Sequence, residues 1–351
     1  MFKEHVAAGG HVQGLLQVCR HWHNLTIHDP RLWTFIVVDA EKVDALMDNS
    51  ASQGISVQLA RSEDLPLHIS VSDSAQLPHR EDKLPRKSNS WVIFAAIWRH
   101  SHRWGRATLK LDLSLGGAGQ HIYDPTQEPA HFPLLRALTV EASATPNDHP
   151  IFIDEMVGAL TLSKFQNTPS LSSLRIPAIT FANIGGELPL FASKPFPPLG
   201  FVSVKRCDQY SLFRWLEYTR GSLATFEVES IYQSSFVPLP TSKYLVLPSL
   251  DSLRLPLPQG GITFLNRLEV PNLKTLILHL DPDEGRAHDV ASIPDLIARS
   301  DCRPERIEIF VPETVPSSDI RALFPQLGLE ETEYKEGRGV KKIYFIRGDS
   351  G

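Results

Sequence analysis

Cysteine is scarce in this chain. Its 351 residues include three cysteines, and they lie far apart: Cys19, Cys207 and Cys302. Three scattered thiols cannot form a disulfide framework, and no pair has the spacing of a metal site. The scarcity excludes a small disulfide-stabilised secreted fold and favours a reducing compartment, the cytoplasm or the nucleus.

Long apolar runs and a strong charge imbalance are also missing. No stretch approaches the roughly 20 apolar residues of a membrane-spanning helix, and the start lacks the apolar core of a signal peptide. The formal net charge is -5, and no Arg-rich stretch interleaved with aromatic residues is present. We therefore expect neither nucleic acid nor membrane among the partners of the chain.

Recognisable catalytic and metal-binding motifs are absent as well. Among the 14 histidines, the group at His21, His23 and His28 has no carboxylate or thiol at a useful spacing. Residues 116–119 lack the Lys-Ser/Thr of a phosphate-binding loop, and no nucleophile elbow or Ser-His-Asp order is found. We predict no catalytic residue, no metal site and no cofactor, with an enzyme on an unrecognised α/β fold as the alternative.

The most informative stretch that is present covers residues 15–33. Its apolar residues have the spacing of one helix face: Leu15, Val18, Trp22 and Leu25. This periodicity predicts a single helix over residues 15–25 and, taken alone, a core helix of a globular domain. Asp29 predicts an N-cap, and Pro30 suits the first position of a second helical turn.

The order Val18-Cys19-Arg20-x-Trp22, followed by Pro30-x-Leu32-Trp33, resembles the second half of an F-box. F-boxes are small helical modules that dock substrate receptors onto the Skp linker of cullin–RING ubiquitin ligases. The Leu-Pro-x-Glu helix that begins an F-box has no counterpart in residues 1–14. We therefore expect a truncated F-box-like helical segment over residues 1–33, in which the first helix is lost or the start is misassigned.

The resemblance implies that this segment docks onto the Skp linker. The residues expected at that interface are Leu15, Leu16, Val18, Trp22, Pro30, Leu32 and Trp33. Some of them are expected to pack against the first strand of the following domain instead.

A loose repeat runs through the rest of the chain. Its unit is a proline followed by Leu-x-x-Leu-x-Leu or a close variant, as in Pro248–Leu255 and Pro271–Leu278. The central apolar residues are Leu138, Leu174, Val202, Phe226, Leu253, Leu276 and Ile307. Their separations centre on the roughly 20–29 residues that are typical of leucine-rich repeats. Each Leu-x-Leu end predicts a short strand, and parallel stacking of the strands buries a continuous apolar column.

The fold class that we predict is α/β: a leucine-rich-repeat-like solenoid with parallel strands over residues 34–347, after a small truncated all-α F-box segment. Residues 348–351 are expected to be a flexible tail, and an ordinary parallel α/β sheet is the alternative fold. Strands are predicted at residues 35–38 and 65–71. Helices are predicted at residues 91–100, 153–165 and 209–219 with Asp208 as N-cap, and over the second half of 289–299, after Pro294. Polar loops are predicted at residues 76–89, 116–127 and 281–287.

The combination of box and repeats resembles the large class of fungal F-box proteins with leucine-rich-like repeats. It implies a substrate receptor, an adaptor subunit of a Skp–cullin–F-box ubiquitin ligase, that binds an unknown target protein and has no chemistry of its own. A binding solenoid that has lost ligase docking is the alternative.

Strand alternation predicts which residues face the partner on the concave strand face. The target-binding residues expected there are Arg175, Lys205, Glu227, Arg254, Ile277, Arg306 and Glu308. Their charges are of mixed sign, which suits a protein partner because opposing charges set register and specificity. The alternative is that these charges only neutralise one another across neighbouring strands and keep the sheet soluble.

Overall fold

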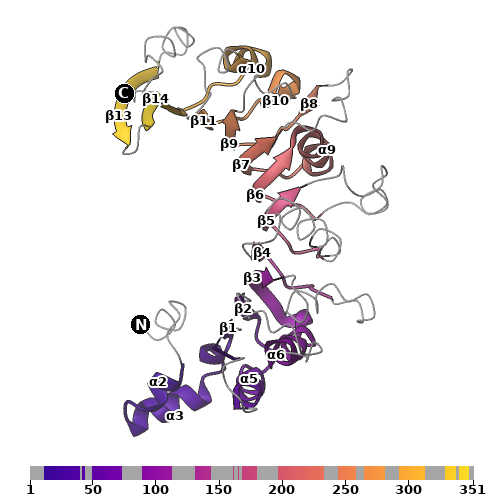
Figure 1. Cartoon of the computed structure of the whole chain (residues 1–351), viewed down its shortest axis with the longest axis vertical. Helices are drawn as coiled ribbons and strands as arrows, with labels where there is room; N and C mark the ends of the chain where they lie inside the picture. The colour runs from indigo at the N-terminus through magenta and orange to yellow at the C-terminus, as the bar shows by residue number, and fades with distance from the viewer. Residues whose placement is uncertain are drawn as a thin grey trace, which may run out of the picture. The chain divides into compact units, whose positions relative to one another are not determined.

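The computed structural model divides into two compact units, Met1–Pro177 and Ala178–Gly351. The structure describes residues 12–39, 42–43, 50–72, 89–112, 131–143, 161, 165, 168–179, 197–232, 244–257, 265–280, 292–312, 329–336 and 340–347. Nearly all of the helix expected at 153–165, the three polar loops and the tail at 348–351 lie outside these residues. Both units are α/β, with mostly parallel strands in a sheet that does not close (Figure 1).

The first unit begins with a small helical box made of α2 (Val12–Leu16), α3 (Arg20–His28) and the 3-10 helix η1 (Pro30–Trp33). The prediction of one helix over residues 15–25 is wrong, because the chain breaks between α2 and α3. Val18 N–H donates to Leu15 O at 3.4 Å, which closes α2 with a tighter turn. Cys19 is then extended, with φ -163° and ψ 169°, and its carbonyl accepts from His23 N–H to begin α3.

The sheet of the first unit contains five strands in chain order: β1 (Phe35–Asp39), β2 (Leu67–Ser72), β3 (Trp104–Asp112), β4 (Ala137–Ser143) and β5 (Ser173–Ile179). All of the pairs between them are parallel. The connections contain α5 (Ser50–Arg61), α6 (Asn89–Trp98) and the 3-10 helix η2 (Ser101–Arg103). Figure 1 shows α5 and α6 on one side of β1–β3, as crossover connections between parallel strands require.

Aromatic side chains fill the space between these connections and the sheet. Trp98 lies with its ring centroid 5.4 Å from that of Trp104 and 5.3 Å from that of Phe132. Phe165 adds a fourth ring, 4.7 Å from Phe132. Edge-to-face pairs of this kind stabilise a core beyond the area they bury. They give the first unit a hydrophobic core of its own.

The sheet of the second unit is larger. Its parallel strands are β6 (Phe201–Asp208), β7 (Thr225–Tyr232), β9 (Ser252–Leu257), β11 (Thr275–Leu280) and β12 (Arg306–Pro312), in that spatial order. Figure 1 shows α9 (Gln209–Thr219) and α10 (Ser292–Ser300) on one side of it. A second, two-stranded parallel sheet pairs β8 (Leu245–Val246) with β10 (Leu268–Glu269), which follows the 3-10 helix η3 (Leu265–Arg267).

The parallel order ends at β12. The next strands are β14 (Val340–Arg347) and β13 (Leu329–Glu336), and both β12–β14 and β13–β14 pair antiparallel. The expectation of parallel strands up to residue 347 is therefore wrong at this end. The β13–β14 pair is antiparallel because only three residues separate the two strands, whereas a parallel pair needs a crossover of a dozen or more residues.

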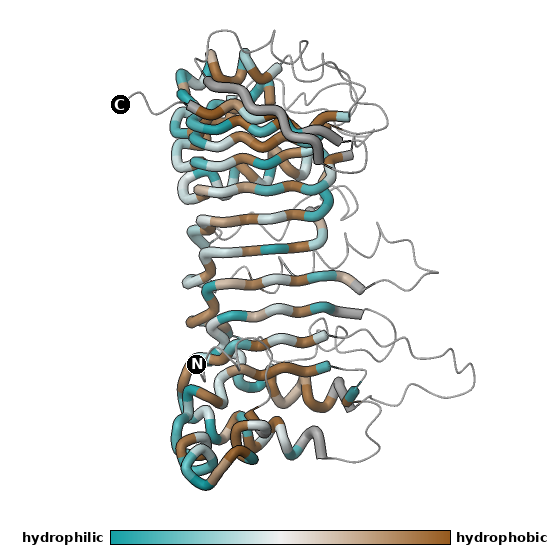
Figure 2. Tube along the Cα trace, turned by 90° about the vertical axis from the view of Figure 1, so that its left-hand side faces the viewer, coloured by the Kyte–Doolittle hydropathy of each residue, from teal (hydrophilic) through white to brown (hydrophobic). Residues whose placement is uncertain are grey.

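Alternation along the strands follows the predicted parity in both units. Leu174, Val202, Phe226, Leu253, Leu276 and Ile307 are all buried, as is the second residue after each of them. Figure 2 shows the hydrophobic and hydrophilic residues alternating along the strands. The leucines of the repeat are therefore core residues.

A recurring hydrogen-bond pattern marks the entry to several of the parallel strands. The carbonyl of Asp251 accepts from the N–H groups of Lys274 and Thr275, at 2.8 and 2.9 Å. The carbonyls of Gly200, Ala224 and Lys274 do the same: each accepts from two consecutive N–H groups at the entry to the next strand. The residue after the repeat proline adds a side-chain bond: Ser249 Oγ donates to Gly221 O, and Asn272 Nδ2 donates to Pro248 O at 2.6 Å.

Two helices of the second unit were predicted from the sequence, and their first residues can be compared with the structure. The helix at 209–219 is confirmed as α9, and Asp208 caps it by accepting from Ser211 N–H at 2.9 Å. The α10 helix begins at Ser292, earlier than expected from Pro294. The reason is that Pro294 lies in the first turn, where its missing N–H has no intrahelical partner to lose.

Candidate protein-docking surfaces

The helical box has a filled core of its own. Val12 and Leu15 of α2 are buried against Leu32 and Trp33 of η1, and Leu16, Trp22 and Phe35 pack around them, half-buried. A carbonyl at the end of α2 helps to hold the two helices together, because a ring nitrogen of His23 lies 3.2 Å from Leu16 O. The box is therefore a packed module that leads directly into β1.

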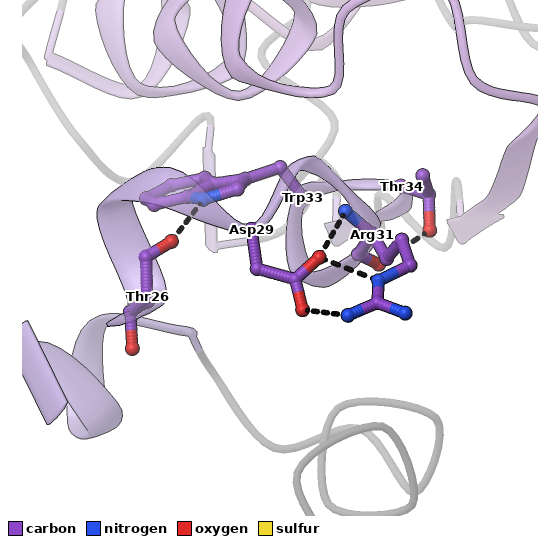
Figure 3. Close-up of polar contacts among 5 residues, drawn as sticks. All are labelled: Thr26, Asp29, Arg31, Trp33 and Thr34. Atoms are coloured by element: carbon purple, nitrogen blue, oxygen red, sulfur yellow. Dashed lines mark hydrogen bonds and ion pairs between the residues drawn. The ribbon is translucent and has the colours of Figure 1, made fainter. Parts of the chain in front are cut away.

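Asp29 organises the turn between α3 and η1 (Figure 3). Its carboxylate accepts from Arg31 N–H at 3.1 Å, from Nε at 2.7 Å and from Nη2 at 2.8 Å. The N-cap predicted from Asp29-Pro30 is thus confirmed, with a bidentate ion pair added to it. Thr34 Oγ1 donates to Arg31 O at 2.9 Å and ends the turn where β1 begins.

Trp33 connects the box to α5. Its indole Nε1–H donates to Thr26 O at 2.7 Å, so the polar edge of the buried ring is satisfied (Figure 3). The guanidinium of Arg61, at the end of α5, lies 4.4 Å above the ring centroid. A cation over an indole face is attractive and holds the ring in one orientation.

The seven expected linker-docking residues divide into three groups. Leu15, Leu32 and Trp33 are buried in the box, whereas Leu16, Trp22 and Pro30 are half-buried. Only Val18 is well exposed, at 59%. Leu25, which was not in the expected set, is 48% exposed on α3. The i, i+3 spacing from Trp22 to Leu25 is the sequence signal that could have added it.

The second surface is the open face of the second unit, defined as the sheet face opposite α9 and α10. Its side chains on the parallel strands include Ser203, Lys205, Thr225, Glu227, Ser252, Arg254, Thr275, Ile277, Arg306 and Glu308. The register places Glu227 beside Arg254, Arg254 beside Ile277 and Ile277 beside Glu308. Four of the expected target-binding residues therefore form one row across the strands.

The other expected target-binding residues lie off this row. Lys205 is exposed on β6, and Arg306 is exposed one row away from Glu308 on β12. Arg175 belongs to the first unit, where it is exposed on β5 beside Thr139 of β4. Arg175, Lys205 and Arg306 are therefore all exposed, as strand alternation predicts.

Glu308 differs from its expected exposure, because it is only 3% exposed. Lys342 Nζ of β14 lies 2.9 Å from Glu308 Oε2, and Arg306 pairs with Oε1. The Lys342 ammonium also lies 4.6 Å from the ring centroid of Phe310 and 4.4 Å from that of Tyr344. The buried carboxylate is thus paired with two cations, which offset the cost of removing its charge from water.

His279 extends this arrangement to β9. Its ring stacks on Phe310 with centroids 4.2 Å apart and an interplanar angle of 8°. Arg254 Nε–H donates to His279 Nε2 at 3.2 Å, which requires an unprotonated acceptor nitrogen. Burial and the charges of Arg254 and Lys342 lower the pKa of His279 to about 4, against a smaller opposing effect of Glu308.

We name these residues the C-terminal cluster: Arg254, Ile277, His279, Arg306, Glu308, Phe310, Lys342, Tyr344 and Ile346. Sequence reasoning missed the members on β14, because residues 340–347 lie beyond the last recognisable repeat. The alternation of Val340-Lys341-Lys342-Ile343-Tyr344-Phe345-Ile346 was the available signal for that strand. His279 and Phe310 were missed because each lies two residues beyond the last target-binding residue expected on its strand, Ile277 on β11 and Glu308 on β12.

The described part of the chain contains no group of His, Cys, Asp or Glu side chains that could hold a metal ion. Within the same residues, no helix is both long and apolar enough to cross a membrane. Cys207 and Cys302 are buried, and burial raises the pKa of the Cys302 thiol to about 11.

The fold and surfaces define an α/β protein with open, mostly parallel sheets and exposed polar and apolar side chains on one sheet face. No known protein-family model matches the chain, and no curated protein resembles it significantly.

Proposed function

We propose that the chain is a substrate receptor of a Skp–cullin–F-box ubiquitin ligase in the cytoplasm or nucleus, with no chemistry of its own. In this proposal the helical box docks onto the Skp linker, and the open sheet face recognises a target protein. The observation that carries it is the exposure of Val18 and Leu25 on a box whose own core is already filled. Apolar side chains that face water on a packed module are available to a partner.

The strand-bearing part is proposed to be a leucine-rich-repeat-like solenoid. The repeated acceptance of two N–H groups by one strand-entry carbonyl supports this reading in both units, at Arg136 in the first and at Asp251 in the second. The side-chain bond after the repeat proline supports it too, since Ser170 Oγ donates to Pro133 O at 2.6 Å, as Asn272 does to Pro248 O. Equivalent bonds at equivalent positions are expected when one structural unit is stacked on the next.

The docking proposal is tested by binding of purified Skp linker to the full chain. Leu25→Glu places a charge in the proposed interface and should weaken binding at least tenfold, about 1.4 kcal/mol. Asn24→Glu adds the same charge to an exposed neighbouring position of α3 and serves as the matched control. Equal affinities of the two variants, or no binding by the parent chain, would reject the box as a docking surface.

A binding solenoid without ligase docking is the second candidate. One observation favours it: Leu15, Leu32 and Trp33, three of the residues that the F-box resemblance assigns to the linker interface, are used in the core of the box. Absence of linker binding by the parent chain, together with retained target binding at the open face, would select this candidate over the first.

A further inference from the structure

The C-terminal cluster carries an excess of positive charge. Arg254, Arg306 and Lys342 lie on the open face of β9, β12 and β14, where two described carboxylates accompany them: Glu308 of β12 and Glu227 of β7, the register neighbour of Arg254. Glu308 already forms ion pairs with both Arg306 and Lys342. Arg254 has a neutral partner, the imidazole of His279. The net charge of the whole chain is -5, so this excess is a local property of the cluster.

Apolar surface lies between the cations. Ile346 is 46% exposed on β14 and pairs in register with Arg306. Ile277 lies half-buried between Arg254 and Glu308 in the row across the strands. Tyr344 and Phe310 are held in place by Lys342 and by the stack with His279. Aromatic residues and arginines held on a rigid sheet are the side chains that most often dominate protein interfaces.

The spacing of the cations favours an extended ligand over a single small anion. Neighbouring strands lie about 4.8 Å apart, so Arg254 on β9 and Arg306 on β12, with β11 between them, are separated by about 10 Å or more at the backbone. One carboxylate cannot engage both guanidinium groups at that separation without bending both side chains toward it. In an extended segment the residues at i, i+2 and i+4 face one side, so an acidic, an apolar and an acidic residue at those positions match the order of Arg254, Ile277 and Arg306.

We propose that the C-terminal cluster binds an extended acidic peptide segment of a partner protein, with carboxylates on Arg254 and Arg306 and an apolar side chain over Ile277 and Ile346. The proposal deepens the proposed function and rests on its assignment of target recognition to the open face. Each guanidinium can present two N–H groups to a carboxylate, which gives orientation as well as attraction. The neutral His279 ring holds Arg254 without satisfying its charge.

The test is selection of a random twelve-residue peptide library on the immobilised full chain. Enriched peptides should contain at least two Asp or Glu residues around an aliphatic or aromatic residue. A fluorescein-labelled enriched peptide should bind at least tenfold more tightly than its Gln/Asn counterpart, a difference of about 1.4 kcal/mol. Because the chain as a whole is negatively charged, non-specific attraction would favour basic peptides instead.

Three variants locate the site. Arg254→Glu and Arg306→Gln should each weaken binding of the acidic peptide about tenfold or more, as expected for loss of a charge-assisted contact. Arg303→Glu changes an exposed arginine in the segment between α10 and β12 and should leave the affinity within about twofold. Urea unfolding of each variant establishes that the fold is intact, and Arg306→Gln avoids placing a second carboxylate beside Glu308.

Several results would overturn the proposal. These are enrichment of basic or uncharged peptides, no enrichment, an equal loss in Arg303→Glu, or tighter binding of a twelve-nucleotide oligo-dT than of the peptide. Skp-linker binding is measured on the same preparations. If the chain binds the Skp linker but not the acidic peptide, only the proposed class of partner is rejected. If it binds the peptide but not the linker, only ligase docking is rejected.

Discussion

At the residue scale, buried polar side chains are the best-defined parts of this protein. Trp33, Asp208 and Glu308 are all buried, and each has specific partners for its polar atoms. Such groups are costly when unpaired, so their partners fix side-chain orientation as well as contributing stability. His279 shows the same principle on the open face, where one hydrogen bond and one ring stack fix its orientation.

The charge state of His279 predicts a pH dependence of stability. Its pKa is about 4 in the folded chain, because of burial and the charges of Arg254 and Lys342, against about 6.5 when unfolded. Between these values the unfolded chain binds a proton that the folded chain does not, so the free energy of unfolding falls as pH falls from 6.5 to 4. One proton limits the slope to about 1.4 kcal/mol per pH unit, and solvent screening of this half-buried ring lowers it.

Urea unfolding midpoints measured between pH 4 and pH 8 test this expectation. His279→Gln keeps a hydrogen-bond acceptor for Arg254 but cannot titrate. The difference in free energy of unfolding between parent and variant should rise with pH up to about 6.5 and then become constant. Arg254, Lys342, Glu308 and Arg306 are present in both proteins, so their own titration cancels in the difference. Parallel curves across the whole range would contradict the assignment of a neutral, low-pKa imidazole.

At the element scale, arginines join successive helices and strands through backbone carbonyls. Arg103, at the end of η2, donates through Nε and Nη2 to Leu65 O at 3.2 and 3.1 Å, and through Nη2 to Ser62 O and Oγ. It thereby holds the turn between α5 and β2. Arg299 of α10 has a comparable role, because it donates to Leu265 O at 2.6 Å and to Leu268 O at 3.0 Å.

Replacing the planar fork of Arg103 tests this role. In Arg103→Lys one compact ammonium cannot reach all of these acceptors, and the buried carbonyls of Ser62 and Leu65 lose partners. We expect the free energy of unfolding to fall by about 2–3 kcal/mol in urea titrations. Arg99→Lys, at an exposed position just after α6, should change it by less than about 0.5 kcal/mol. Equal stabilities of the two variants would show that Arg103 does not hold this turn.

At the scale of the whole molecule, the two units have separate cores. The first depends on aromatic rings around Trp98 and Phe132, whereas the second depends on the aliphatic columns of β6–β12. In a stacked array each strand contacts only its neighbours, so damage is expected to spread locally rather than through the chain.

Leu276→Ala tests how far such damage spreads. Leu276 is fully buried on β11, so the substitution should cost about 2–5 kcal/mol of local stability. Hydrogen exchange should then accelerate in β9, β11 and β12 and stay unchanged in β1–β3. Ile277→Ala, at the adjacent half-buried position of the open face, should have a smaller effect. A uniform loss of protection in both units would mean that the chain unfolds as one cooperative body.

The sequence by itself determined the strands of the repeats, their parity and the helix at 209–219. Period-2 alternation and an N-cap are local properties, so the order of residues alone places Leu253 and Leu276 in the core and Arg254 on the open face. The same kind of local pattern predicted the Asp29 cap. The linker-docking and target-binding roles of these residues stay predictions.

Only the tertiary structure decided how those residues are used. It divided the apolar stripe of residues 15–25 between two helices, because the extended Cys19 interrupts the turn, and it buried Leu15 while exposing Leu25. It also brought β14 onto β12, so that Lys342 covers Glu308 and a residue expected to face water became buried. The local sequence pattern specifies which side of a helix or strand is apolar. The elements that pack against it come from distant parts of the sequence, and they decide which polar groups are buried and which apolar groups stay exposed to water.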